Sequence, residues 1–365
     1  MRVGSAKPRS DVMQATANLN IAAFDTMPAP EDILGRVPIT DRATATVLSG
    51  RATLEAILDR RDPRRFVVVG PCSMHDPVAG LDYAHRLRGL ADEVADVLVL
   101  VMRVYFEKPR TTTGWKGFIN DPFLNDTFHI ADGMQMARSF LLTVNELGLP
   151  AATEALDPIA PQYLGDLIAW TAIGARTAES QTHREMSSGL STPVGFKNGT
   201  DGSIDTAINA ILSAAQPHSF LGINALGQSC IVRTRGNRYG HLVLRGGDSR
   251  PNYDTVSVAM AEQALLKAQL PANLVIDCSH ANSHKRPELQ PLVMQDVVNQ
   301  IHAGNHSILG MMVESFIEAG NQPIPEDPAR LRYGCSVTDA CISWPTTEHM
   351  IREATAALRT RDRAR

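Results

Sequence analysis

Four residues of the types that bind divalent metal ions stand at widely separated points of the sequence. They are Cys72, His280, Glu314 and Asp339. One thiolate, one imidazole and two carboxylates can hold a single ion, and this mixture of soft and hard donors fits Zn, Fe, Mn or Co. No short ligand motif joins the four residues, and a lone cysteine is commonly buried packing. The residues alone therefore leave open both one metal site and four unrelated positions.

A second set of residues is basic and implies an anionic ligand. Arginine suits bidentate binding of phosphate or carboxylate, whereas lysine supplies a compact charge. Any single member could be an ordinary surface ion pair, worth ~0 to 1 kcal/mol. All of them together predict a site for two anionic groups or two anionic substrates. The set is Arg103, Lys108, Arg110, Arg176, Lys197 and Arg245.

The elements that would position these residues are short apolar runs, which alternate with helical patterns such as 77–94, 132–147 and 159–169. This alternation implies βαβ crossovers. Side chains just past the carboxyl ends of parallel strands converge on one face of a (β/α)8 barrel, where such enzymes keep their chemistry. We therefore predict an α/β fold, a TIM barrel. Its strands are expected at 66–70, 97–102, 150–153, 172–175, 193–196, 219–223, 274–277 and 307–313.

Two segments fall outside this alternation. Residues 1–65 combine a polar start, a proline-rich stretch and a helical pattern at 41–59, which predicts an N-terminal extension before a barrel over 66–357 and a tail over 358–365. The runs 229–234 and 240–245 flank a Gly236-Asn237 turn signal. They predict a β-hairpin inserted after the sixth strand.

Composition disfavours several classes of protein. The formal net charge is −4, and no block of like charges is long enough for a nucleic-acid arm or a polybasic membrane patch. Five cysteines without a CxxC pair disfavour a disulfide framework and fit a reducing cytoplasm. The apolar runs are shorter than the ~20 residues that a membrane-spanning helix requires. We expect a cytoplasmic protein with no nucleic-acid or membrane partner.

Seven longer motifs resemble those of one enzyme family. They are Gly70–Ser73, Arg103–Thr111, Gly114–Gly117, Gly174–Thr177, Gly195–Gly202, Leu244–Gly247 and Ser279–Asn282. From about residue 12 to residue 357 the chain resembles the type I 3-deoxy-D-arabino-heptulosonate 7-phosphate (DAHP) synthases. The resemblance implies a transferase that condenses phosphoenolpyruvate with D-erythrose 4-phosphate, giving DAHP and phosphate. This reaction is the first step of the shikimate route to aromatic amino acids.

The resemblance also assigns roles to individual residues. One divalent ion would be bound by Cys72, His280, Glu314 and Asp339. The phosphate of phosphoenolpyruvate would be held by Arg176, Lys197 and Arg245, with Arg103 and Lys108 near its carboxylate. The sugar phosphate would be received by Arg110 and Thr111. The catalytic group would comprise Lys108, Glu154, Lys197 and His280.

Feedback inhibition by an aromatic amino acid is a further expectation from the resemblance. Tyrosine is favoured over phenylalanine or tryptophan because Gly222 leaves room for a ring that bears a hydroxyl group, and Ser191 could be its polar partner. The effector site would include Ser191, Phe220 and Gly222. The extension 1–65 would supply regulatory and subunit contacts in a homodimer or homotetramer.

Two other classes of function remain open. A Schiff-base aldolase would use Lys197 at a strand end to form an imine with a sugar phosphate. A non-catalytic sensor barrel would bind an aromatic amino acid and control a partner protein. The four metal-type residues argue against the sensor, because such a protein has no need of them.

Overall fold

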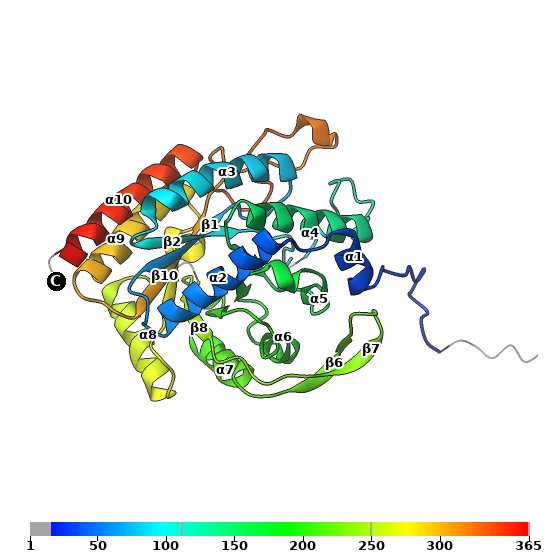
Figure 1. The fold of residues 1–365 in the computed structure, drawn as a ribbon, viewed down its shortest axis with the longest axis horizontal. Helices are drawn as coiled ribbons and strands as arrows, with labels where there is room; N and C mark the ends of the chain where they lie inside the picture. The colour runs from blue at the N-terminus through cyan, green and yellow to red at the C-terminus, as the bar shows by residue number, and fades with distance from the viewer. Residues whose placement is uncertain (1–15, 111, 249, 364–365) are drawn as a thin grey trace, which may run out of the picture.

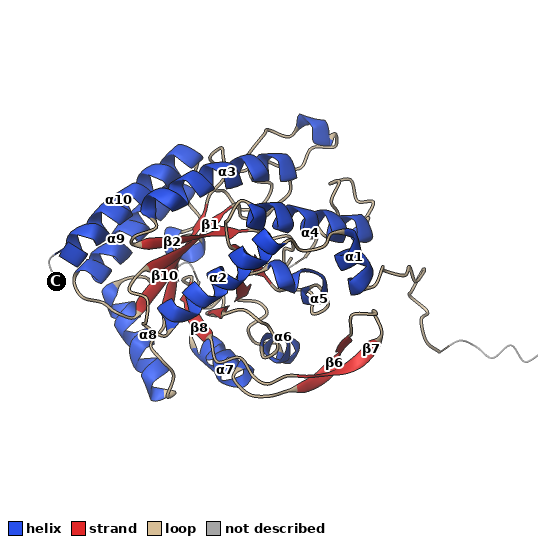
Figure 2. Cartoon of the chain, viewed as in Figure 1, coloured by secondary structure: helices blue, strands red, loops and turns tan. Residues whose placement is uncertain are grey.

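The computed structural model describes residues 16–110, 112–248 and 250–363. Eight parallel strands close into a barrel, and helices surround it (Figures 1 and 2). Strand β1 pairs with both β2 and β10, which closes the sheet. The predicted TIM barrel is therefore confirmed. Its strands are β1 (Arg65–Gly70), β2 (Leu98–Arg103), β3 (Ala151–Glu154), β4 (Trp170–Ile173), β5 (Val194–Lys197), β8 (Gly240–Leu244), β9 (Leu274–Asp277) and β10 (Ile308–Glu314).

The helices follow the βαβ order that the sequence pattern predicts. Helix α3 shows the local reason, because Pro77 begins it and the Asp76 side chain accepts hydrogen bonds from the first free N–H groups. The outer helices are α3 (Pro77–Val94), α4 (Ile130–Glu146), α5 (Pro161–Leu164), α6 (Gln181–Ser187), α7 (Asp205–Ala214), α8 (Thr255–Lys267), α9 (Gln290–His302) and α10 (Trp344–Arg363). Short 3-10 helices are η1 (Gly165–Leu167), η2 (His280–Ser283), η3 (Pro287–Leu289) and η4 (Pro328–Arg330).

Two helices precede the barrel, α1 (Pro30–Arg36) and α2 (Asp41–Leu58). Leu54, Ile57 and Leu58 of α2 share one buried cluster with the side chains inside the barrel. In this cluster Phe66 and Trp170 come from the first residues of their strands, so α2 covers the amino-terminal end of the barrel. Helix α2 therefore does not cover the carboxyl ends of the strands, where the candidate functional residues are expected.

The predicted hairpin exists, and the run 229–234 forms one of its strands, but its partner strand and its place were wrong. Its partner is 219–223, which was predicted as the sixth barrel strand, whereas 240–245 enters the barrel as that strand. The hairpin is formed by β6 (Ser219–Ile223) and β7 (Ser229–Arg233), which pair antiparallel outside the barrel and lie between the fifth and sixth barrel strands. Both strands alternate exposed and half-buried residues, whereas β8 is almost wholly buried. The Asn237 side chain donates to the carbonyls of Ser187, Leu190 and Thr192, and so directs the chain into the barrel.

The alternation of side chains along the strands explains how the interior is filled. Near the amino-terminal end of the barrel, which α2 covers, glycines leave room for large aromatic rings. A Cβ added to Gly195 would lie 2.4 Å from Trp170, and a Cβ added to Gly310 would lie 2.8 Å from Phe66. The last inward position of five strands instead carries a charged residue. These five side chains are all buried, and they are Arg103, Glu154, Lys197, Asp277 and Glu314.

No helix in the described part of the chain is both long enough and apolar enough to span a membrane.

Candidate active site

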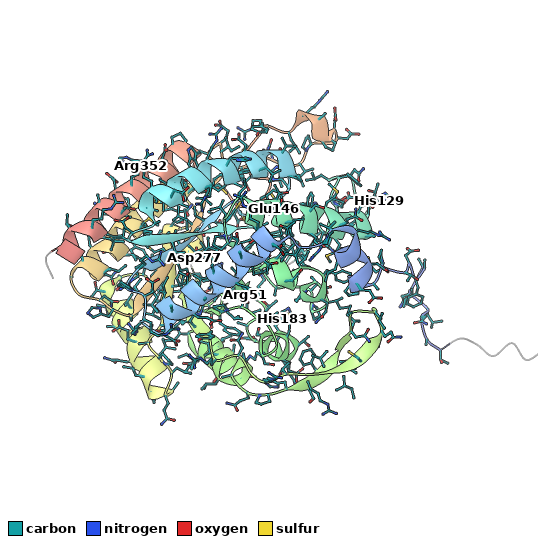
Figure 3. All side chains as sticks on the ribbon, in the orientation of Figure 1. Arg51, His129, Glu146, His183, Asp277 and Arg352 are labelled. Atoms are coloured by element: carbon teal, nitrogen blue, oxygen red, sulfur yellow. The ribbon has the colours of Figure 1, made fainter. Side chains whose placement is uncertain are left out.

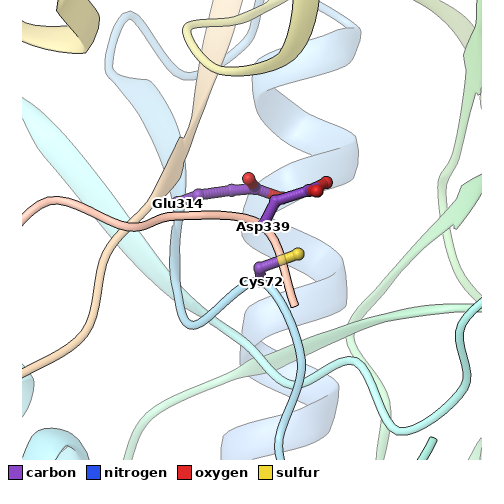
Figure 4. Close-up of side chains that lie close together, drawn as sticks. All are labelled: Cys72, Glu314 and Asp339. Atoms are coloured by element: carbon purple, nitrogen blue, oxygen red, sulfur yellow. The ribbon is translucent and has the colours of Figure 1, made fainter. Parts of the chain in front are cut away.

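Three of the predicted metal ligands lie together at the carboxyl ends of the strands (Figure 4). Cys72 follows β1, Glu314 ends the neighbouring strand β10, and Asp339 comes from the loop before α10. One donor atom from each lies within 4.8 Å of the others. Donors bound about 2.0–2.3 Å from one ion are at most about 4.6 Å apart, so small side-chain rotations would bring them into range. These residues therefore fit a metal site.

His280 adds the imidazole to this group. Its Nε2 lies 3.9 Å from Glu314 Oε1, and its Nδ1 lies 2.9 Å from Asp277 Oδ2 on the other side of the ring. The backbone of His280 is left-handed, with φ of 57° at the start of η2. Such a conformation is uncommon for residues other than glycine and persists where the surroundings impose it. The fold thus turns Nε2 toward Glu314.

Two cations lie beside the metal-type donors. Lys108 Nζ is 3.1 Å from Cys72 Sγ, and it also donates to the Cys72 carbonyl. Burial and the Glu314 carboxylate raise the pKa of the Cys72 thiol, and the Lys108 charge opposes them. Arg103 pairs with Glu314 at 3.0 Å, and its guanidinium lies 3.5 Å from the centre of the Tyr105 ring. Both cations stabilise negative charge on the cysteine and glutamate.

The other predicted cations differ in how they are paired. Lys197 Nζ lies 2.9 Å from Asp277 Oδ2 in a buried ion pair. Among the described residues, Arg110, Arg176 and Arg245 make no ion pair with a carboxylate. Burial lowers the pKa of Arg245, the Asp277 carboxylate opposes this, and the Arg176 charge lowers the pKa further. Neighbouring guanidinium groups without acidic partners are suited to bind an anion.

Glu154 ends β3 inside the barrel and is 8% exposed. Gly174 leaves it space, because a Cβ there would lie 2.3 Å from Glu154 Oε1. Arg110 donates to the Trp115 carbonyl in the loop after β2, while Thr111 lies outside the described residues. The structure thus brings most of the predicted catalytic and binding residues to one face of the barrel.

Comparison with known proteins identifies the family. The model of the DAHP synthetase I family matches residues 39–352. The chain belongs to the DAHP synthetase I family. The Tyr-sensitive phospho-2-dehydro-3-deoxyheptonate aldolase of Escherichia coli strain K12 is 53% identical over 339 residues, 93% of this chain and 95% of the relative. The Phe-sensitive enzyme of the same strain is 51% identical over 344 residues, 94% of this chain and 98% of the relative.

The fold agrees with a solved member of the family. The phospho-2-dehydro-3-deoxyheptonate aldolase of Francisella tularensis SCHU S4 superimposes with a TM-score of 0.91 at 44% identity, and the match covers 94% of this chain and 99% of that one. The expected resemblance to the DAHP synthases is confirmed. The prediction that the protein is an enzyme is also confirmed, because the matched relatives are named as enzymes.

The residues predicted for the effector of this DAHP synthetase I family member fall in two places. Ser191 lines a cavity of about 440 Å³ between the barrel and α5, together with Leu34, Arg51 and Gln162. Glu107 also lines it, and burial and Asp157 raise the pKa of its carboxyl to about 7. Phe220 and Gly222 lie on β6 and are not among the described residues that line this cavity.

Two buried residues of the site, Asp277 and Gln290, have no role predicted from the sequence. Asp277 contacts both Lys197 and His280. Burial raises its pKa, but His280 and Lys197 together lower it well below the ordinary value, so it is a carboxylate. Gln290 exchanges two hydrogen bonds with the backbone of Glu314, at 3.0 and 2.9 Å. Asp277 ends an apolar run at an inward position, which could have marked it, whereas nothing near Gln290 in the sequence points to Glu314.

Proposed function

We propose that this chain is a DAHP synthase that condenses phosphoenolpyruvate with D-erythrose 4-phosphate and releases phosphate. The observation that carries the proposal is the convergence of metal-type donors and guanidinium groups on the open face of the barrel, in a member of the DAHP synthetase I family. Two substrates that bear phosphate need several cations in one place.

A divalent ion would be held by Cys72, His280, Glu314 and Asp339. Manganese, iron, cobalt and zinc all suit this set of donors. When bound, the ion would polarise the aldehyde oxygen of the sugar phosphate as a Lewis acid. Lys108 supports the set by its contact with Cys72 Sγ, because a neighbouring cation favours the thiolate.

Phosphoenolpyruvate would lie between these donors and the guanidinium groups. Arg176, Lys197 and Arg245 would bind its phosphate, and Arg103 and Lys108 would face its carboxylate. Arg110 and Thr111 would bind the phosphate of the sugar. Arg176 and Arg245 form no ion pair with a carboxylate among the described residues, and this supports their role, because their charges can pair with an anion.

The bond-forming steps need two proton carriers. Carbon 3 of the enol would attack the aldehyde carbon, and Lys108 would protonate the resulting alkoxide. Water would add to carbon 2, with Glu154 accepting its proton, and collapse of this adduct would release phosphate. The position of Glu154 inside the barrel supports its assignment, because a buried carboxylate is shielded from bulk water.

Feedback inhibition by an aromatic amino acid would act through the cavity lined by Ser191. Its volume of about 440 Å³ suits one such ligand, and Arg51 offers a positive charge for the carboxylate of the amino acid. Relatives named Tyr-sensitive and Phe-sensitive share about half of their residues with this chain. We favour tyrosine, with Phe220 and Gly222 shaping the outer part of the site. The protein would act in the cytoplasm as a homodimer or homotetramer, with residues 1–65 supplying regulatory and subunit contacts.

The deciding experiment measures phosphate release with both substrates, with and without a chelator. Release should require both substrates and should stop when the metal is removed. Cys72→Ala should remain folded and inactive. Full activity of that variant or of metal-free protein would overturn the metal assignment, and lack of release by metal-loaded wild-type protein would overturn the function.

A further inference from the structure

Asp277 lies at the end of β9 and is completely buried (Figure 3). A buried carboxylate is costly unless cations and hydrogen-bond donors surround it. The structure supplies four such contacts from three residues. Oδ2 lies 2.9 Å from Lys197 Nζ and 2.9 Å from His280 Nδ1, and Oδ1 accepts from the backbone N–H and the hydroxyl of Ser279 at 3.0 and 2.6 Å.

These contacts fix which nitrogen of His280 carries the proton. The Ser279 hydroxyl gives its only hydrogen to Asp277, so its oxygen acts as an acceptor toward His280 Nδ1 at 2.7 Å. Asp277 Oδ2 is also an acceptor. Nδ1 therefore has two acceptors and must carry the hydrogen. Nε2 is therefore the ring nitrogen that is available to a metal ion, and it faces Glu314.

The same carboxylate holds Lys197. Only 4% of Lys197 is exposed, and its ammonium is paired with Asp277. The ion pair joins β5 to β9, which are separated by β8 in the sheet order. One side chain thus connects a residue proposed to bind phosphate with a residue proposed to bind the metal.

We propose that Asp277 is a positioning residue that orients His280 for metal binding and Lys197 for phosphoenolpyruvate binding. The proposal rests on the function proposed above, and it adds a residue to which no role was assigned there. Carboxylates that accept the second N–H of a metal-bound histidine raise its basicity and fix its ring, and their loss weakens metal binding by about 10- to 100-fold.

Asp277→Asn tests this role because the amide keeps the shape of the side chain and removes its charge. The variant should bind Co²⁺, added alone and measured by competition with a chromophoric chelator, about 10- to 100-fold more weakly. The absorption band of the cysteine thiolate bound to cobalt should still appear at saturation. The KM for phosphoenolpyruvate should rise severalfold, because Lys197 loses its anchor. Asp254→Asn is a matched control, since Asp254 caps α8 and asparagine caps a helix equally well.

Unchanged Co²⁺ affinity together with an unchanged KM would overturn the proposal. A second measurement applies if the variant does not fold. Cobalt-loaded wild-type protein should show one strongly shifted, slowly exchanging imidazole N–H proton in its NMR spectrum, from His280 Nδ1. Absence of that signal would overturn the proposal as well. The Co²⁺ experiments need no substrate, so they remain decisive even if wild-type protein fails to release phosphate.

Discussion

The contact of Lys197 with Asp277 bears on whether this lysine forms an imine or binds an anion. A Schiff-base aldolase needs a neutral amine as nucleophile. The Lys197 nitrogen lies 2.9 Å from the Asp277 carboxylate in a buried ion pair, and this contact occupies the nitrogen that an imine would require. The geometry therefore favours a lysine that binds an anion by charge over one that forms an imine.

Lys197→Arg should reduce kcat/KM by at least about tenfold, although the charge is kept. The planar guanidinium cannot replace a compact ammonium in a buried position matched to one carboxylate. Steady-state kinetics with both substrates would measure the loss. Treating wild-type protein with borohydride in the presence of sugar phosphate should leave the mass of the Lys197 peptide unchanged. A reduced adduct on that peptide would restore the aldolase alternative.

His241 predicts a pH dependence of stability. It is buried in the barrel, where Trp170 Nε1 donates to its Nε2 at 3.1 Å, and burial lowers its pKa to about 4. An unfolded histidine titrates near pH 6.5, so between about pH 6.5 and pH 4 the unfolded chain binds the extra proton. Stability should therefore fall as the pH drops through this range, by up to about 1.4 kcal/mol per pH unit.

Urea unfolding of wild type and His241→Asn at several pH values would measure this contribution. The variant should be less stable at neutral pH and should have a shallower slope between pH 6.5 and pH 4. His85→Asn, at an exposed position, is the control and should keep the wild-type slope. An equal slope in His241→Asn would show that other groups cause the pH dependence.

At the scale of elements, the barrel depends on small residues opposite large ones. Gly310 of β10 faces Phe66 of β1, and an added Cβ would lie 2.8 Å from ring atoms that are fully buried. Gly310→Ala should therefore lower the free energy of unfolding by about 1–3 kcal/mol, the usual cost of overpacking.

Gly89→Ala is the matched control for this change. Gly89 lies on the exposed side of α3, and nothing lies within 4 Å of its added Cβ. The same substitution should raise the free energy of unfolding by about 0.5–1 kcal/mol, because alanine favours the helix. Urea midpoints would measure both effects. Equal shifts in the two variants would contradict the packing argument.

The place of one strand could not be predicted from the sequence pattern. The run Ser219–Ile223 has the composition of a barrel strand, yet it forms the outer hairpin with β7. Whether a short apolar run enters a barrel depends on what covers its two faces, and those neighbours come from distant parts of the chain. By contrast, the predicted bounds of α3 agree with the structure, because Asp76 and Pro77 mark its start locally.

At the scale of the whole molecule, tyrosine should inhibit the enzyme through the cavity lined by Ser191. Ser191→Leu would fill part of this space and remove a hydroxyl, so the tyrosine concentration for half-inhibition should rise at least about tenfold. Initial rates at several tyrosine concentrations would measure it. Coupling between two binding sites is reciprocal. If tyrosine weakens the binding of phosphoenolpyruvate, phosphoenolpyruvate should therefore weaken the binding of tyrosine by the same factor. Equal sensitivity in wild type and variant would contradict this location.

The sequence by itself determined which metal-binding and charged side chains are present and that they lie at the carboxyl ends of the barrel strands. Inward and outward positions alternate along a strand, so Arg103, Glu154 and Lys197 could be placed at strand ends from the pattern alone. The tertiary structure decided which of these groups touch. Lys197 and His280 lie 83 positions apart in the sequence, yet both contact Asp277, because β5 and β9 are the two neighbours of β8 in the barrel. Contacts of this kind depend on the whole sheet, and no local pattern of residues contains them.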